Sequence, residues 1–302
     1  QSYDADGREI QRIDYHKNGN VSTQTDTQYL AEGSVSIEQR FTADAKLSYK
    51  YQRNTAKNWS LRENFNADGE LIVREERLDD QYQGLYIGSA WNGDIKRVSY
   101  VNGKMHGEYR VGVENSSSFV RGSYHHGVKV GQWLSKTRDI TLTEHFNQQG
   151  QLAGEQKEVT ADGTVMRLEF YKNDKLHGDY LRRNFDGQIQ AKGRYVNGQR
   201  EGAWQLQDEN SYSELKLWHG SYKAGHEVGK WQAFSANGHL LGLMQYDEQG
   251  RIQGKVYSFN EDGSLFQSDE YVDHQLHGQS VLYASGEPFS VHLYQQGRLI
   301  SD

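Results

Sequence analysis

The chain has no cysteine among its 302 residues and a single proline, Pro288. The absence of cysteine excludes disulfide bonds, thiol nucleophiles and thiolate metal ligands. Proline cannot donate a hydrogen bond to a β-ladder, so its near absence is consistent with one long ladder. No apolar run reaches the roughly 18 residues of a transmembrane helix. The chain begins with Gln1 rather than methionine, which predicts a periplasmic protein whose leader was removed on export; a cytoplasmic protein is the alternative.

Positive charge is also in short supply, with 34 basic against 41 acidic residues and a net charge of −7. This balance disfavours binding to nucleic acid or to anionic lipid. It predicts a protein partner with a basic surface. Membrane association is expected only if a lipid anchor, absent from this sequence, was attached. The mean hydropathy of −0.92 is too low for a thick core. With 32 glycines and 20 tyrosines, a thin sheet covered by aromatic side chains is expected.

What the chain has in abundance is a repeated phrase, seen most clearly in residues 193–204. Glycine is followed by tyrosine two residues later, by glycines three and then four residues further on, and by tryptophan after two more. Aromatic markers from Tyr100 to Tyr294 recur every 22 to 27 residues, which indicates an array of supersecondary units. The three complete copies supply the predicted structural residues Tyr124, Gly127, Gly131, Trp133, Tyr195, Gly198, Gly202, Trp204, Tyr222, Gly225, Gly229 and Trp231.

Two kinds of turn divide each unit. Asn197-Gly198 suits a two-residue hairpin loop, in which both central residues need positive φ. The phrase Phe65-Asn-Ala-Asp-Gly69 suits a longer hairpin loop with glycine in the left-handed region. The chain is therefore predicted to be all-β and built of tandem β-hairpins. On the returning strand Gly202 and Trp204 are expected to share a face, with Gly202 leaving a slot for an aromatic ring.

The period predicts one continuous array over residues 1–302, with degenerate or capping repeats in 1–99 and regular repeats in 100–302. Between Tyr195 and Tyr222 the step lengthens to 27 residues, which marks an insertion at 208–219. Insertions in arrays tend to form loops on the binding face. Trp218 is the strongest candidate contact, although a position packed on the sheet is the alternative for it. The predicted partner-binding residues are Asp208, Glu209, Tyr212, Glu214, Trp218 and His219.

The histidines predict no metal site. His106, His177 and His277 each precede a repeat glycine, and separations of 71 and 100 residues place them several hairpins apart, too far to share an ion. His125 and His126 are adjacent and would point to opposite faces of a strand. No Gly-x-Ser-x-Gly, His-Glu-x-x-His or dinucleotide-binding motif is present. The sequence thus predicts a protein without enzymatic activity, catalytic residues, cofactor or metal.

The repeated frame, with His-Gly at Gly107, Gly178 and Gly278, resembles the MORN repeat in its bacterial variant form. Trp133, Trp204 and Trp231 stand where the eukaryotic repeat usually has glycine. The resemblance implies hairpins stacked into an elongated, twisted, antiparallel single-layer sheet. It also implies an immunity or antitoxin protein, which binds a secreted bacterial toxin and occludes it. An envelope scaffold that contacts glycan or lipid is the alternative.

Overall fold

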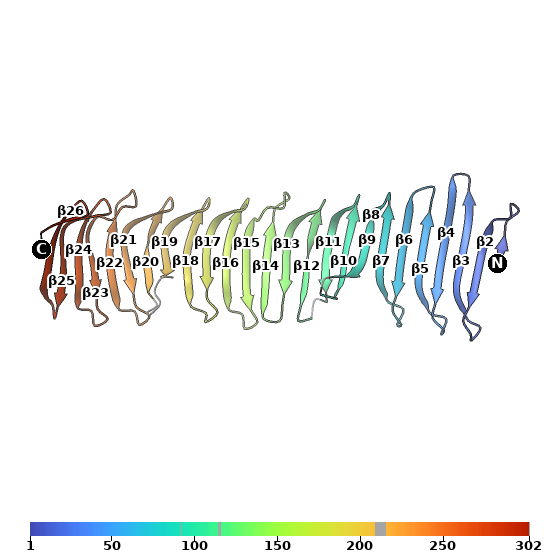
Figure 1. Ribbon diagram of the computed structural model, residues 1–302, viewed down its shortest axis with the longest axis horizontal. Helices are drawn as coiled ribbons and strands as arrows, with labels where there is room; N and C mark the ends of the chain where they lie inside the picture. The colour runs from blue at the N-terminus through green and yellow to red at the C-terminus, as the bar shows by residue number, and fades with distance from the viewer. Residues whose placement is uncertain (91, 114–115, 209–215, 302) are drawn as a thin grey trace. The chain divides into compact units, whose positions relative to one another are not determined.

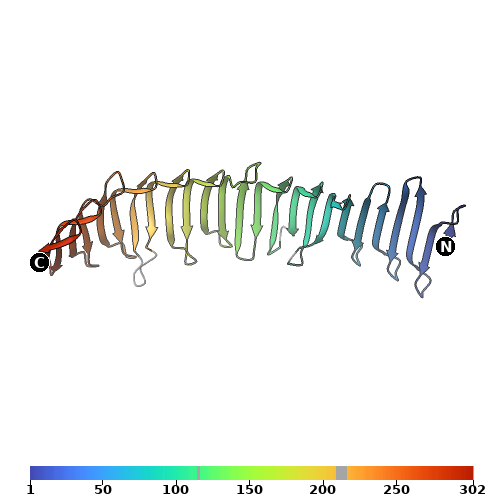
Figure 2. The ribbon, with the colours of Figure 1, turned by 45° about the horizontal axis from the view of Figure 1, so that its top comes forward.

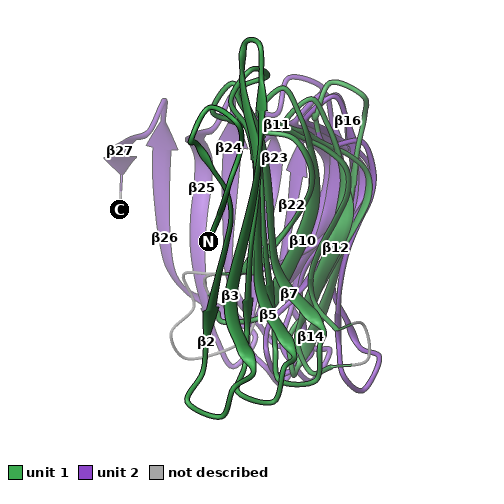
Figure 3. Ribbon diagram, turned by 90° about the vertical axis from the view of Figure 1, so that its right-hand side faces the viewer, with its two compact units in different colours: residues 1–151 green, residues 152–302 purple. Residues whose placement is uncertain are grey.

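The computed structural model describes residues 1–90, 92–113, 116–208 and 216–301. These residues form 27 β-strands and contain no helix, so no helix among them could cross a membrane. The prediction of an all-β chain is confirmed. The chain divides into two compact units, unit 1 over residues 1–151 and unit 2 over residues 152–302, coloured separately in Figure 3.

Unit 1 is a single layer of antiparallel strands that lie side by side in sequence order (Figure 1). One departure from this order is that β7 pairs with both β8 and β9. The strands are β1 (Ser2–Tyr3), β2 (Glu9–Tyr15), β3 (Val21–Leu30), β4 (Gly33–Phe41), β5 (Leu47–Asn54), β6 (Trp59–Phe65), β7 (Leu71–Leu78), β8 (Gln81–Tyr82), β9 (Gly84–Ser89), β10 (Ile95–Val101), β11 (Lys104–Gly112), β12 (Phe119–His125), β13 (Val128–Lys136) and β14 (Ile140–Phe146).

Unit 2 is built in the same way, and each of its strands pairs antiparallel with the next (Figure 2). Its last pairings, of β25 with β26 and of β26 with β27, continue the pattern. The strands are β15 (Gly154–Thr160), β16 (Val165–Lys172), β17 (Lys175–Arg183), β18 (Ile189–Val196), β19 (Gln199–Gln207), β20 (Leu217–Lys223), β21 (His226–Phe234), β22 (Leu240–Tyr246), β23 (Gly254–Phe259), β24 (Leu265–Val272), β25 (Gln275–Ala284), β26 (Glu287–Gln295) and β27 (Arg298–Ser301).

The two-residue turns have the predicted backbone conformation. Asn197 and Gly198 have φ angles of 51° and 86°, as this kind of turn requires. The Gly198 N–H donates to the carbonyl of Leu176 in the preceding hairpin at 2.7 Å, so neighbouring turns are bonded to each other. The same bond joins Gly103 to Tyr82, Gly127 to Met105, Gly225 to Arg200, and Gly297 to Leu276.

The longer loops also follow the prediction, because their last glycine is left-handed. In the loop after β6, Gly69 has a φ of 84°. The side chain of Asn66 holds the loop by accepting hydrogen bonds from the N–H groups of Asp68 and Glu70, at 3.0 and 2.9 Å. This is the local side-chain-to-backbone bonding that favours asparagine and aspartate in turns. Asn147, Asn184 and Asp247 hold equivalent loops in the same way.

Each complete repeat buries its tryptophan over a glycine of the preceding strand. Trp204 is only 3% exposed. A Cβ built on Gly193 would lie 2.2 Å from the indole ring, so only glycine fits beneath it. The indole N–H donates to the Arg194 carbonyl at 3.2 Å, while Tyr180 and Tyr195 flank the ring at centroid distances of 5.8 and 5.0 Å. Trp133 over Gly122 and Trp231 over Gly220 repeat the arrangement.

The expectation that Gly202 provides the slot is wrong. Its φ is +70°, and nothing lies within 4 Å of a Cβ built there. Lys192 pairs with Gln205, but Arg194 pairs with Glu201, so β19 carries extra residues between these pairs. Gly202 therefore forms a β-bulge, which glycine favours because the left-handed conformation is strained for other residues. The ring sits over the glycine before the turn, not over the one after it.

The first strands of unit 1 use charged side chains where later hairpins use aromatic rings. Arg62 pairs with Glu75 across β6 and β7 at 2.8 Å. Arg74 pairs with Glu76 at 3.0 Å, and the indole N–H of Trp59 donates to Glu76 at 3.0 Å. Arg74 and Glu76 lie on the same strand. The contacts of Arg62 with Glu75 and of Trp59 with Glu76, by contrast, are cross-strand pairs, which stabilise a half-exposed sheet surface. β6 and β7 thus keep the ladder of the later hairpins, while different side chains cover it.

Candidate functional site

Of the predicted contact residues in segment 208–219, the structure describes Asp208, Trp218 and His219, and it does not bring these three into one site. Glu209, Tyr212 and Glu214 lie outside the described residues. Asp208 begins the connection after β19, and its N–H donates to the Lys216 carbonyl at 2.9 Å. Trp218 and His219 are consecutive residues of β20, so their side chains point to opposite faces of the sheet.

Trp218 occupies the alternative position considered for it, packed on the sheet. It pairs with Leu206 of β19 and contacts the core cluster of Trp204, Tyr222 and Trp231. The face that carries this cluster is called the aromatic face of unit 2. Tyr222 adds a polar link there: its hydroxyl accepts from Arg200 at 2.9 Å and donates to Glu227 at 3.0 Å. Burial raises the pKa of Tyr222 to about 12, so its hydroxyl remains protonated.

His219 lines a shallow hollow of about 660 Å³ in unit 2. Asp179 pairs with Arg194, and Leu181 pairs with Lys192, on the face opposite the aromatic one. The small Ala203 leaves room at the centre. The hollow is open and its lining is mainly apolar, with charged side chains of both signs among it, and this open shape suits contact with a macromolecule better than the enclosure of a small ligand. Its lining includes Leu168, Asp179, Leu181, Lys192, Arg194, Ala203, Gln205 and His219.

A buried carboxylate in unit 2 is occupied by structural bonds. Glu169 is 6% exposed. It accepts a hydrogen bond from the hydroxyl of Tyr171 at 3.0 Å and contacts Arg167 at 3.4 Å. Burial, followed by the negative charge of Glu169, raises the pKa of Tyr171 to about 12. Glu169 is therefore held by a permanent donor and a cation, an arrangement that stabilises the sheet.

The last strands of unit 2 expose apolar side chains that no sequence motif singled out. Phe289 is 64% exposed, Val291 44% and Leu293 38%. Val291 and Leu293 alternate and so share one face of β26, while Phe289 lies where the pairing of β25 with β26 shifts register. Val281, which is buried, pairs with Val291 and continues the row onto β25. The name C-terminal apolar surface is used below for the exposed β26 residues Phe289, Val291 and Leu293.

The acidic surplus of the chain is concentrated in the same part of the sequence. Residues 1–151 contain 19 basic and 20 acidic residues, whereas residues 152–302 contain 15 and 21. Within 245–302 the numbers are three and nine. Backbone hydrogen bonding from Arg251 lowers the pKa of Asp247, and hydrogen bonding from the Ser264 hydroxyl lowers the pKa of Asp262. Both carboxylates therefore keep their charge well into acidic solution.

The expectation that His125 and His126 point apart is also wrong. His126 is the first residue of a two-residue turn, with a φ of 48°, and so it is not part of the strand alternation. The two ring centroids lie 4.5 Å apart, and His106 of the neighbouring strand joins them at 5.1 and 4.8 Å. Desolvation by the groups around it, with a smaller effect of the neighbouring histidines and Lys104, lowers the pKa of the exposed His126.

No protein-family profile and no curated protein sequence matches the chain. Among solved structures, the crystal structure of a porin-like protein from Bacteroides uniformis aligns over 93% of this chain and 91% of its own, with 8% sequence identity and a TM-score of 0.13. A likeness this weak carries no argument about fold or function. The function is therefore inferred from the residues themselves.

Proposed function

We propose that the protein is a non-catalytic binding protein of the immunity type, which occludes a secreted bacterial toxin with a basic surface. The observation that carries the proposal is the C-terminal apolar surface, together with the acidic surplus of residues 245–302. Exposed apolar patches rimmed by charge are typical of protein interfaces. The acidic surplus would steer a basic partner toward the surface and disfavour acidic ones. The immunity role rests on the resemblance to the bacterial MORN variants.

The local geometry gives the interface a rigid base. β26 is bonded on one side to β25 and on the other to β27. The exposed side chains of Phe289 and Val291 are therefore held by a paired strand, which lowers the entropy lost when a partner covers them. Of the three basic residues in 245–302, Arg251 pairs with Asp247 and Asp273, and Lys255 pairs with Glu270. Arg298 of β27 is the third, and nine acidic residues in the same stretch leave its net charge negative.

The test is a capture experiment with the whole chain as bait for the secreted proteins of the source organism. We expect one basic protein to be retained in a one-to-one complex that weakens as salt is raised, and its toxic activity to be blocked by the bait. The double variant Phe289→Ser/Val291→Ser should lose both effects. Phe185→Ser is the matched control, because Phe185 is 97% exposed on a turn of the same unit and should be dispensable.

Three results would overturn the proposal or part of it. Equal loss of binding in the control would show that general stickiness, not this surface, retains the partner. Retention of the toxin by the double variant would move the interface elsewhere, and replacing residues 209–214 with a Gly-Ser segment of equal length would then test the predicted 208–219 contact. Capture of glycan or lipid, with no protein, would reject the immunity role in favour of the envelope scaffold.

A further inference from the structure

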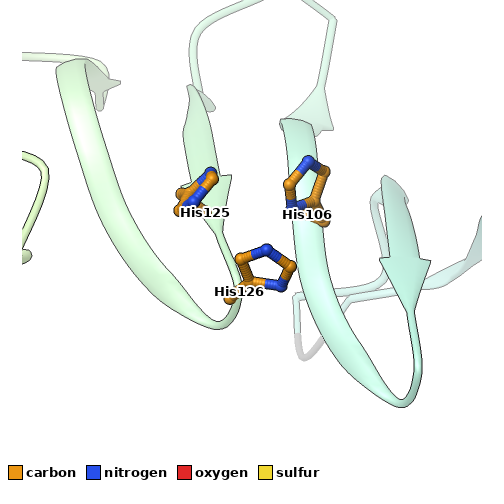
Figure 4. Close-up of side chains that lie close together, drawn as sticks. All are labelled: His106, His125 and His126. Carbon is orange, nitrogen blue, oxygen red and sulfur yellow. The ribbon is translucent and has the colours of Figure 1, made fainter.

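Three histidines of unit 1 meet where the strand pair β11–β12 ends at a turn. His125 is the last residue of β12, and His126 and Gly127 form the turn that follows, with φ angles of 48° and 91°. His106 lies on β11, one residue beyond the paired Gly107 and Tyr124. One nitrogen from each ring lies within 4.8 Å of the other two. Figure 4 shows the three rings gathered between the two strands.

The repeat gives the position of His106 a structural task elsewhere in the chain. In three hairpins the residue before a glycine of positive φ accepts a hydrogen bond from the first N–H of the next two-residue turn. Asn197 donates to His177 Nδ1 at 3.3 Å, and Ala224 donates to Glu201 at 2.9 Å. Gln83 accepts in the same way from Asn102 at 2.9 Å. A side-chain acceptor at this position therefore fixes the neighbouring turn.

His106 departs from this rule. Its Nδ1 is buried and has no hydrogen-bond partner among the described residues, although it occupies the position of His177. A buried polar atom without a partner is destabilising and calls for an explanation. Here the two other side chains that approach His106 are imidazoles, which are also the preferred nitrogen ligands of zinc, copper and nickel.

We propose that His106, His125 and His126 together bind a divalent transition-metal ion of the zinc type. Zinc–nitrogen bonds of about 2.05 Å in a tetrahedral site place ligand nitrogens roughly 3.4 Å apart. The rings must therefore close by about 1.4 Å from the 4.8 Å limit of the cluster. His125 and His126 are exposed side chains, which can rotate to make this adjustment. Three protein ligands leave a fourth position for water or for a donor atom of a bound molecule.

Calorimetric titration of the metal-free chain with zinc chloride tests the site. We expect one ion per chain and a rise in melting temperature on zinc addition, because a ligand that binds the folded state stabilises it. His126→Ala, at an exposed position that should not disturb folding, should weaken binding by about 100-fold or more, since even outer-shell changes cost 10- to 100-fold. His106→Ala should do the same. Cobalt in place of zinc should give the visible absorption of a tetrahedral site.

His177→Ala is the matched control, because it removes the equivalent repeat histidine, beside Val196 and Asn197 in place of His125 and His126. It should bind zinc like the unaltered chain. Undiminished binding by His126→Ala, equal loss in His177→Ala, or the absence of a stoichiometric site would each overturn the proposal. Magnesium chloride should produce no heat or stabilisation, because magnesium prefers oxygen ligands.

Discussion

The contact of Gly193 with Trp204 makes a quantitative prediction about what specifies the repeat. Gly193→Ala places a methyl group 2.2 Å from the indole, well inside van der Waals contact. Overpacking of this kind costs about 1–3 kcal/mol of unfolding free energy. Trp204→Ala leaves a cavity in place of a side chain that is 3% exposed, at a cost of about 3–5 kcal/mol. In the double variant the ring that collides with the new methyl is gone, so its cost should fall below the sum by about 1–2 kcal/mol.

Urea unfolding of the four proteins, followed by far-ultraviolet circular dichroism, measures the coupling. The control cycle pairs Trp204→Ala with Gly202→Ala. Gly202→Ala should cost about 1 kcal/mol through its left-handed backbone, and it should be additive with Trp204→Ala because nothing lies within 4 Å of its Cβ. If Gly193→Ala and Trp204→Ala were additive in unfolding free energy, or if Gly202→Ala and Trp204→Ala were coupled, Gly193 would not be the glycine beneath the Trp204 ring. The slope of each transition must stay constant for the comparison to hold.

Two further predictions concern backbone strain and alkaline pH. Ala45 has a φ of 60° at the position where equivalent loops carry glycines such as Gly69. Ala45→Gly should therefore stabilise unit 1 by about 1 kcal/mol, and Gly69→Ala should destabilise it by a similar amount. Urea midpoints that move in the opposite directions would contradict this prediction. Tyr171 and Tyr222 have pKa values raised from 10 to about 12. Between these values the unfolded chain has lost the protons that the fold retains, so stability should be intact below pH 10 and fall toward pH 12. A urea midpoint that is constant across this range would contradict the assignment.

Much of the fold could be predicted from the sequence because its signals are local. Asn197-Gly198 and the loop ending at Gly69 specify their turns through φ angles that few other residues tolerate. The recurrence of such turns then requires antiparallel strands in sequence order. By contrast, the glycine that lies beneath the tryptophan ring is determined by a bulge, because the bulge at Gly202 changes which residues share a face. Counting alternate residues along the strand therefore chose the wrong glycine.

The candidate sites were harder to predict because they depend on contacts between strands. Nothing local distinguishes His106 from His177, since both precede a repeat glycine. The difference arises on the next strand, where two histidines stand in one case, and valine and asparagine in the other. Pairing each repeat position with its neighbour one unit later would have revealed the cluster. Trp218 shows the converse, because a residue that is unusual in sequence packs in an ordinary place on the sheet.

A residue that departs from the repeat indicates a functional site only when the structural role of that repeat position is known. In the regular hairpins a side chain before the bulge glycine fixes the next turn, and a tryptophan covers the glycine before that turn. A repeat position that performs its task can vary in sequence without a change of role, as Gln83, His177 and Glu201 demonstrate. His106 has the same residue type as His177, but its Nδ1 does not accept the hydrogen bond from the next turn, so its structural role differs. Residue type alone would suggest that His106 is an ordinary repeat position, because histidine recurs there, and that Gln83 and Glu201 are the exceptions.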